Sequence, residues 1–234
     1  MQNTQNKILM SAEILFSEQG FASTSLREIT RHAGVNLAAV NYHFGNKQQL
    51  IVEVFQHHMD SLNKERLQRL DKITSSGQPV FLEEVLRALI YPALKLSRDN
   101  EGGGDRFVKL IARIYAESNE DLHAFLVNHY GHVIKRFAST IQAILPDMPA
   151  KELRWQLDFV IGALTYVMAD FSGHFSHKGD LQPGVINEAD RLVSFAAAGI
   201  RSFQPSRAQK DLFSMGGNAT SPAPLKTKET GRPS

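Results

Sequence analysis

The stretch from Ser25 to Phe44, SLREITRHAGVNLAAVNYHF, carries start and stop signals for two short helices separated by one glycine. Ser25 and Glu28 have the spacing of a capping box, in which each side chain binds an unpaired backbone amide at the helix start. Gly34 stands where a helix can end in the left-handed conformation, which glycine adopts without steric cost. Asn36 can then cap a second helix. The pattern predicts two helices joined by a tight turn.

The second of these helices, about residues 37–42, is too short to persist alone. Val40 and Phe44 must therefore pin it against the helices before it. Its outer face then presents small, apolar or hydrogen-bonding side chains and no acid: Leu37, Ala38, Asn41 and Tyr42. The major groove of DNA accepts such a face, because Asn can pair with adenine and apolar groups can meet thymine methyls. The segment is typical of a helix-turn-helix that reads DNA.

Three places around this segment suit phosphate groups. Thr24 and Ser25 open one helix, Tyr42 and His43 close the next, and Lys47 begins another. Helix N-termini present free amides and a positive dipole end to phosphate oxygens. The formal net charge of the chain is only +2, and residues 1–50 hold four Lys/Arg against three Asp/Glu. The prediction of DNA binding therefore depends on where groups are placed and not on bulk charge.

Apolar residues recur at helical spacing nearly throughout the chain, and strand-like alternation is scarce. The predicted helices cover residues 4–19, 25–33, 37–42, 47–73, 80–97, 106–118, 121–145, 150–175 and 187–203. We expect an all-α chain in three parts: a helix-turn-helix domain of three helices (1–50), a helical bundle for ligand binding and dimerisation (51–203), and a disordered tail (204–234) rich in Ser, Pro, Gly, Thr and Lys. A long fourth helix joins the first two parts.

Composition argues against other classes of protein. The chain has no cysteine, which excludes disulfides and thiolate sites and fits a cytoplasmic location. It has no signal peptide pattern and no long apolar run, so no membrane segment is expected. No GxSxG, P-loop or GxGxxG motif occurs, and His129 and His132 have no Asp or Glu in a ligand pattern. We therefore expect no enzyme, no metal and no cofactor.

Residues 5–52 resemble the DNA-binding domain of TetR-family regulators, most closely in GVNLAAVNYHFGNKQQL. NLAAVNYHFG is further similar to the fatty-acid-responsive regulators of the PsrA type and to the CecR-like regulators, and LRWQLDFVIGALTYVMADFSG looks weakly like the PsrA-type C-terminal region. The resemblance implies a homodimer that binds palindromic operator DNA, usually as a repressor, and is released by a small ligand. By motif position the DNA contacts would be Thr24, Ser25, Arg27, Asn36, Leu37, Ala38, Asn41, Tyr42, His43 and Lys47.

The same resemblance points to a hydrophobic effector, either a long-chain fatty acid or acyl-CoA that controls fatty-acid metabolism genes, or a different hydrophobic ligand that controls efflux or stress genes. Each buried methylene contributes about 0.8 kcal/mol, and an acyl head group would need a cation. The candidates for the ligand site are Arg106, Phe107, Lys109, Arg113, Phe159 and Tyr166. Plain core packing of the aromatic residues and solvation of the charged ones remain the alternative.

The last two predicted helices are the candidates for dimerisation, as a four-helix interface. Their candidate residues follow helical spacing or are small enough to permit close approach: Leu157, Ile161, Leu164, Met168, Ala197 and Ile200. Some of these positions can equally serve the core of one chain. A DNA-binding protein without a ligand is the second rival interpretation, although the length of the second part disfavours it. The basic tail could add nonspecific attraction to phosphates, or be a solvated extension.

Overall fold

The computed structural model of the chain describes residues 2–99, 101–117, 120–170 and 185–202. The described residues form α-helices and no strands, which confirms the predicted all-α fold. The helices are α1 (Gln2–Gln19), α2 (Leu26–Ala33), α3 (Leu37–Phe44), α4 (Lys47–Thr74), α5 (Leu82–Ser97), α6 (Gly104–Glu117), α7 (Glu120–Ile144), α8 (Ala150–Ala169) and α9 (Val185–Ser202).

The predicted boundaries differ from these mainly at the end of α8. We expected this helix to continue to residue 175, but it stops at Ala169 because Asp170 adopts a left-handed conformation with φ of 47°. An aspartate tolerates that conformation better than most residues with a side chain. Residues 171–184 and the predicted tail (204–234) lie outside the described part of the chain.

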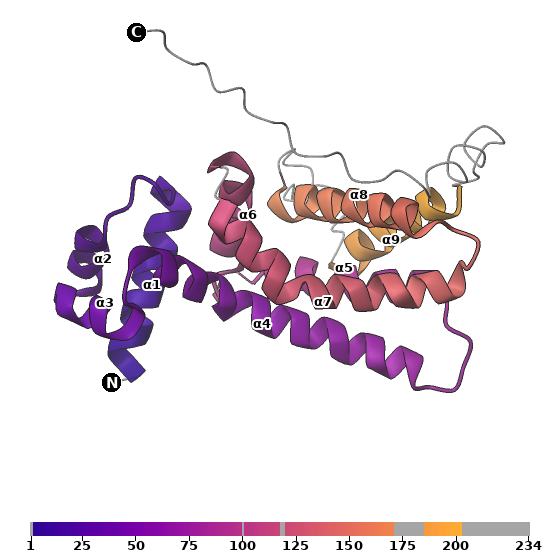
Figure 1. Cartoon of the computed structure of the whole chain (residues 1–234), viewed down its shortest axis with the longest axis horizontal. Helices are drawn as coiled ribbons and strands as arrows, with labels where there is room; N and C mark the ends of the chain where they lie inside the picture. The colour runs from indigo at the N-terminus through magenta and orange to yellow at the C-terminus, as the bar shows by residue number, and fades with distance from the viewer. Residues whose placement is uncertain (1, 100, 118–119, 171–184, 203–234) are drawn as a thin grey trace, which may run out of the picture. The chain divides into compact units, whose positions relative to one another are not determined.

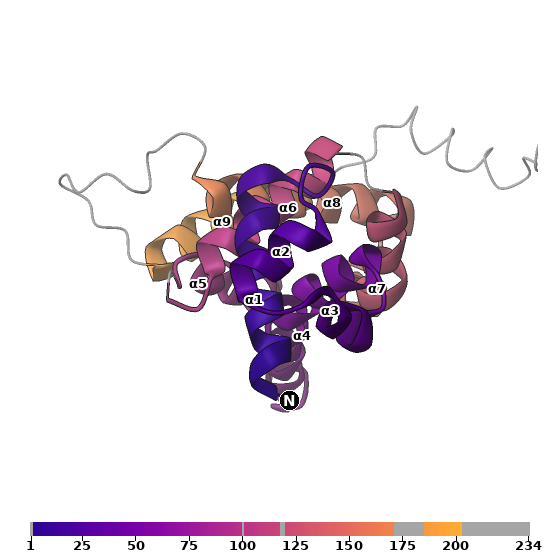
Figure 2. The ribbon, with the colours of Figure 1, turned by 90° about the vertical axis from the view of Figure 1, so that its left-hand side faces the viewer.

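Residues Met1–Ile200 form one compact unit. Helices α1, α2 and α3 gather at one end of this unit, and α4 leads from them along the bundle (Figure 1). The view along the molecule from that end shows the three short helices in front of the bundle (Figure 2). Within the bundle α4 packs on α5 and α7, and α8 packs on α5, α6 and α7. Helix α4 therefore belongs to both the helix-turn-helix module and the bundle.

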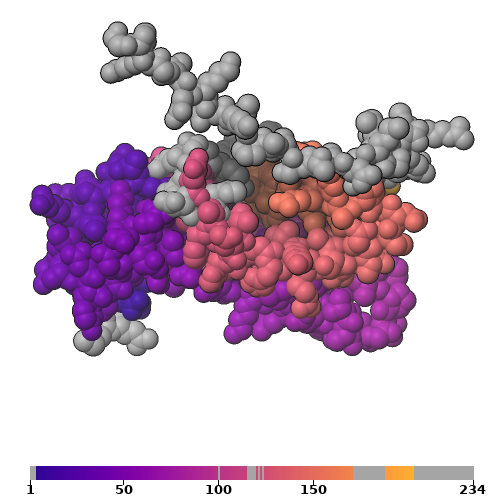
Figure 3. All heavy atoms as spheres, viewed as in Figure 1, coloured from indigo at the N-terminus to yellow at the C-terminus, as the bar shows by residue number. Residues whose placement is uncertain are grey.

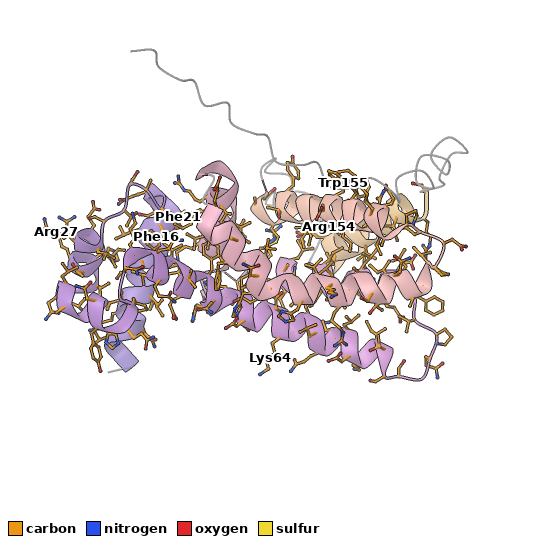
Figure 4. The ribbon with its side chains drawn as sticks, viewed as in Figure 1. Phe16, Phe21, Arg27, Lys64, Arg154 and Trp155 are labelled. Atoms are coloured by element: carbon orange, nitrogen blue, oxygen red, sulfur yellow. The ribbon has the colours of Figure 1, made fainter. Side chains whose placement is uncertain are left out.

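A chain of aromatic rings crosses from the module into the bundle. Phe16 packs on Phe21 with ring centroids 5.6 Å apart, Phe21 on Phe55 at 6.0 Å, and Phe55 on Phe107 at 6.3 Å. Figure 4 shows Phe16 and Phe21 next to each other where the module meets the bundle. All four side chains are buried, and buried aromatic pairs stabilise a fold beyond the area that they remove from water. These ring contacts therefore pack the helix-turn-helix module against the bundle.

A buried ionic cluster lies at the same junction. Glu13 of α1 is only 6% exposed. One of its carboxylate oxygens accepts a hydrogen bond from Nε of Arg106 on α6 at 2.9 Å, and the other lies 3.3 Å from Nε2 of His58 on α4. Three helices thus meet at one carboxylate. In the space-filling view the atoms of the module adjoin those of the bundle along the visible face (Figure 3).

Burial alone would raise the pKa of Glu13, but the pKa lies below its usual value because His58 and Arg106 together outweigh burial. The folded protein therefore binds this proton less tightly than the unfolded chain does. A lowered pKa means that the carboxylate's stabilisation is fully present above its ordinary pKa. It is lost as the pH falls through the lowered pKa of the folded state.

We expect Glu13→Gln to lower the free energy of unfolding by about 2 kcal/mol at pH 7, because it leaves the Arg106 guanidinium without its charged partner. The variant should also lose part of the decline in stability that the wild type shows on acidification below about pH 4.5. Urea unfolding followed by circular dichroism at a series of pH values measures both effects.

The matched control is Glu65→Gln, which removes the partly exposed pair between Glu65 and Arg69 within α4. Such a pair contributes about 0.5 kcal/mol or less. Equal effects of the two substitutions on the free energy of unfolding would contradict the role given to Glu13.

Candidate nucleic-acid interface

Helix α2 begins at the predicted capping box. The backbone amide of Ser25 donates to the Glu28 carboxylate at 2.7 Å, and the backbone amide of Glu28 donates to the Ser25 hydroxyl at 3.2 Å. The first of these bonds favours the ionised form and lowers the pKa of Glu28. Both unpaired amides are thereby satisfied, and the start of α2 is fixed at Ser25.

The turn between the helices takes the shape that the sequence indicates. Gly34 adopts a left-handed conformation with φ of 66°, and its amide donates to the carbonyl of Arg31 at 3.3 Å. The amide of Val35 donates to the carbonyl of Thr30 at 3.0 Å. The side-chain oxygen of Asn36 then accepts from the amide of Ala39 at 2.9 Å, which caps α3. Backbone hydrogen bonds at the turn and the side-chain cap of Asn36 therefore fix α3 relative to α2.

Helix α3 presents the predicted outer face. Val40 and Phe44 are buried against the other helices of the module, whereas Asn41 and Tyr42 point to solvent and Tyr42 is 73% exposed. Leu37 and Ala38 are exposed on the first turn. The exposed side chains of α3 thus combine an amide, a phenol and small apolar groups on a rigid helix.

Most of the residues predicted to contact DNA are accessible. Ser25, Arg27, Asn36, Leu37, Ala38, Asn41 and Tyr42 are exposed, and His43 and Lys47 are half-buried. Figure 4 shows Arg27 at the outer end of the module, directed away from the bundle. Lys47 follows Asn46, whose side-chain oxygen caps α4 through the amide of Gln49 at 2.8 Å. Helices α2 and α3, which carry most of these residues, lie next to each other at this end of the unit (Figure 2).

Thr24 is the exception among the residues predicted to contact DNA. Its side chain is 1% exposed, and its hydroxyl donates to the carbonyl of Gly20 at 2.8 Å. The side chain therefore holds the connection between α1 and α2 and is not available to a phosphate. Arg31, one turn after Arg27 on α2, is exposed and was not among the predicted contacts. Its spacing of four residues from Arg27 is the signal that could have identified it.

The six residues predicted for a ligand site do not come together. Arg106 is bound to Glu13, and Phe107 is buried between Phe55 and His58. Lys109 is exposed 3.9 Å from Asp105, and a guanidinium nitrogen of Arg113 donates to the carbonyl of Glu18 at 2.8 Å. Phe159 and Tyr166 lie on the outer surface of α8. The structure corrects the prediction because α6 turns Arg106 and Arg113 toward α1, and Lys109 toward solvent.

The predicted dimer residues also lie elsewhere. Five of the six are buried within the single chain: Leu157, Leu164, Met168, Ala197 and Ile200. Ile161 is half-buried. Side chains that are already buried have little area to offer a partner, so the predicted residues lie on the inward faces of these helices. The outward faces carry large exposed apolar groups, namely Trp155, Phe159 and Tyr166 on α8 and Phe195 on α9.

The described residues contain neither a membrane-spanning helix nor a cluster of metal-binding side chains. None of the helices in this part of the chain is both long and apolar enough to cross a membrane. Within the same ranges, no group of three His, Asp or Glu side chains is arranged to hold a metal ion.

Comparison with known proteins identifies relatives of both parts of the chain. YttP of Bacillus subtilis, a probable helix-turn-helix transcriptional regulator, is 34% identical over 90 residues. The match covers 38% of this chain and 44% of YttP, so the chain aligns with less than half of that curated relative.

Solved structures show the same fold at low identity. A TetR-family transcriptional regulator from Bordetella parapertussis aligns over 88% of this chain and 100% of its own, with a TM-score of 0.64 and 17% identity. The fatty acid degradation regulator FadR from Bacillus halodurans aligns over 85% of this chain and 96% of its own, with a TM-score of 0.59 and 17% identity.

Two family models match the sequence. The model described as bacterial regulatory proteins of the tetR family matches residues 8–54, which hold the capped helices and the glycine turn. The model described as a tetracyclin repressor-like C-terminal domain matches residues 87–199, which hold most of the bundle. Since the matches cover both the helix-turn-helix and the helical bundle that supports it, the chain belongs to the TetR family of bacterial regulatory proteins.

Proposed function

We propose that this protein is a cytoplasmic transcriptional regulator that binds operator DNA through α3. The observation that carries the proposal is the exposed face of this helix, where Asn41 and Tyr42 stand clear of the module while Val40 and Phe44 anchor it from behind. A recognition helix must be held rigidly while its outer side chains reach base edges in the major groove. Arg27, Lys47 and the N-termini of α2 and α4 lie around it and suit phosphates.

The protein acts as a homodimer whose subunits meet through the outward faces of α8 and α9. Trp155, Phe159 and Tyr166 follow each other at helical spacing on α8, and Phe195 on α9 is 71% exposed. Large apolar groups gathered on one surface are typical of a protein interface. Figure 4 shows Trp155 on the side of α8 that faces away from α4. A two-fold axis there would present two copies of α3 to a palindromic operator.

The bundle receives a small hydrophobic effector that releases the DNA, so that the protein acts as a repressor. A long-chain fatty acid or acyl-CoA that controls fatty-acid metabolism genes is the first candidate. It is supported by the resemblance of residues 36–45 to the PsrA-type regulators and by the fold shared with FadR, a fatty acid degradation regulator. The second candidate is a different hydrophobic ligand that acts on efflux or stress genes.

Coupling between effector and DNA follows from the shared elements. Helix α4 runs from the module into the bundle, and α6 is tied to α1 through Arg106 and Glu13. A ligand that shifts α4 or α6 must therefore move the module and change the spacing of the two recognition helices. A coupling free energy of about 1–3 kcal/mol weakens DNA binding by roughly 5- to 150-fold.

Arg27→Ala should weaken binding to every DNA sequence by a similar factor, because a phosphate contact carries no sequence information. The dependence of log affinity on log salt should become shallower by about one for each subunit. Fluorescence anisotropy at several salt concentrations measures both, on DNA that the wild type has selected from a random pool.

The matched control is Lys64→Ala, which removes the same charge from an exposed position on α4 remote from Arg27 (Figure 4). An identical loss of affinity and salt dependence in both variants would show that bulk charge, and not the outer end of the module, binds DNA.

Asn41→Ala should instead lower the preference for selected DNA over random DNA by about 1–3 kcal/mol, since a base contact distinguishes sequences. Its affinity for random DNA should stay close to that of the wild type. Competition binding with the two DNAs measures the ratio, and an unchanged preference would place base recognition on other residues.

Phe159→Glu should convert the dimer into monomers, because it places a charge in the centre of the apolar surface. Sedimentation velocity measures the change in mass. Val127→Glu is the control, since Val127 is an exposed apolar residue of α7 that lies outside this surface. A Phe159→Glu variant that sediments like the wild type would contradict the proposed interface.

A further inference from the structure

One cation of the bundle is almost completely buried and makes no ion pair with an acid of the described residues. Arg66 of α4 is 7% exposed and lies against α5. Its Nε donates to the backbone carbonyl of Leu89 at 2.9 Å, and Nη1 donates to the side-chain oxygen of Asn63 at 3.2 Å. Both acceptors are neutral. The guanidinium has five N–H donors, and these two bonds leave its charge uncompensated.

The acids around Arg66 are engaged elsewhere. In the described part of the chain Arg66 makes no ion pair, and burial lowers its pKa to about 10, so it remains a cation at neutral pH. The acids on the turns of α4 around Arg66 have other partners: Asp60 binds Tyr130, Glu65 binds Arg69 and Asp71 binds Arg136. A buried charge without a partner destabilises a fold unless something neutralises it.

Asn63 supplies a second donor at the same place. Its side chain is 5% exposed, and while its oxygen accepts from Arg66, its Nδ2 has no hydrogen-bond partner among the residues that the structure describes. Buried amide groups are normally satisfied. A guanidinium without a counter-ion and an amide without an acceptor therefore lie one turn apart on α4.

We propose that Arg66 and Asn63 bind the carboxylate head of an anionic effector inside the bundle. A carboxylate offers two oxygens to a planar guanidinium and can accept from the nearby amide at the same time. This inference rests on the proposed effector-binding function and names the chemical class of the ligand. It also replaces Arg106, Lys109 and Arg113, which α6 directs toward α1 or solvent.

The surroundings favour an organic acid over a phosphate. One guanidinium compensates one negative charge, whereas a phosphate dianion would leave a net buried charge. The turns of α4 and α5 on either side of the two polar groups carry buried apolar side chains: Leu62, Leu70, Leu86, Leu89 and Ile90. The apolar body of an organic acid would meet apolar neighbours there.

The position of the site also allows a bound ligand to change DNA binding. Arg66 stands on the helix that begins at Lys47 in the module, and its partner Leu89 stands on α5. A carboxylate bound here must insert between α4 and a neighbouring helix. The ligand would then displace the element that both parts of the chain share.

The test compares acids with alcohols of the same chain length, octanoate with 1-octanol and oleate with oleyl alcohol. Affinities of the full chain come from the ligand dependence of its melting temperature. The wild type should bind at least one acid about tenfold or more tightly than its alcohol, as a charge-assisted hydrogen bond requires. Arg66→Met should abolish this preference and leave the affinity for the alcohol nearly unchanged.

Arg69→Gln is the matched control, since it removes the same charge one turn further along α4 from a partly exposed pair. It should keep the wild-type preference. If Arg66→Met does not fold, Arg66→Lys carries the test, because it keeps the charge but loses the planar fork and should reduce the preference severalfold. An arginine with a merely structural role would leave the preference intact in any variant that folds.

Two results would contradict the proposed site. One is a wild type that binds neither acid more tightly than its alcohol, and the other is a folded Arg66 variant with an unchanged preference for the acid. DNA binding without ligand is measured on the same preparations. A wild type that binds no DNA contradicts the proposed regulator, whereas a carboxylate preference that survives the loss of Arg66 contradicts this site, so the two proposals fail separately.

Discussion

The carboxylate of Glu13, buried between His58 and Arg106, is the interaction on which the rest of the unit depends. It joins α1, α4 and α6 at one point, and the rings of Phe55 and Phe107 pack beside it. A buried carboxylate is tolerated only while both basic neighbours stay in place. The cluster therefore fixes the helix-turn-helix module against the bundle more specifically than apolar packing alone would do.

Helix α4 connects the helix-turn-helix module to the interior of the bundle. Its first turn is capped by Asn46 beside the recognition helix, and Arg66 lies inside the bundle. A rigid helix transmits a displacement at one end to the other, provided that each end has its own contacts. The ionic cluster and the proposed carboxylate site lie on the same helix, about two turns apart. An effector that moves α4 would act on both the module and its attachment.

The local structure of the module could be predicted from sequence because its signals are local. Capping by Ser25 and Asn36 and the left-handed turn at Gly34 depend on neighbours within a few residues, and the structure confirms each one. The burial of Thr24 could not be predicted, because a threonine hydroxyl can donate either to a phosphate outside the protein or to a backbone carbonyl inside it. Residue type does not show that the acceptor here is the carbonyl of Gly20.

The bundle could be predicted only as helices. Helix α8 carries apolar residues on two faces, one buried through Leu157 and Leu164 and one exposed through Trp155 and Phe159. Helical spacing alone cannot tell which face packs inside a chain and which meets a partner. Pairings such as Glu13 with Arg106 join residues far apart in sequence, so no local pattern indicates them. The same limit hid Arg66, which looks in sequence like any surface arginine.

Selection of bound DNA from a random pool by the full-length protein tests the central claim most directly. We expect enrichment of a two-fold symmetric sequence, with half-site centres separated by about one helical turn of DNA or a multiple of it, roughly 34–36 Å per turn. This result requires both an exposed α3 and a dimer built on α8 and α9. Recovery of no preferred sequence, or of a single asymmetric site, would contradict it.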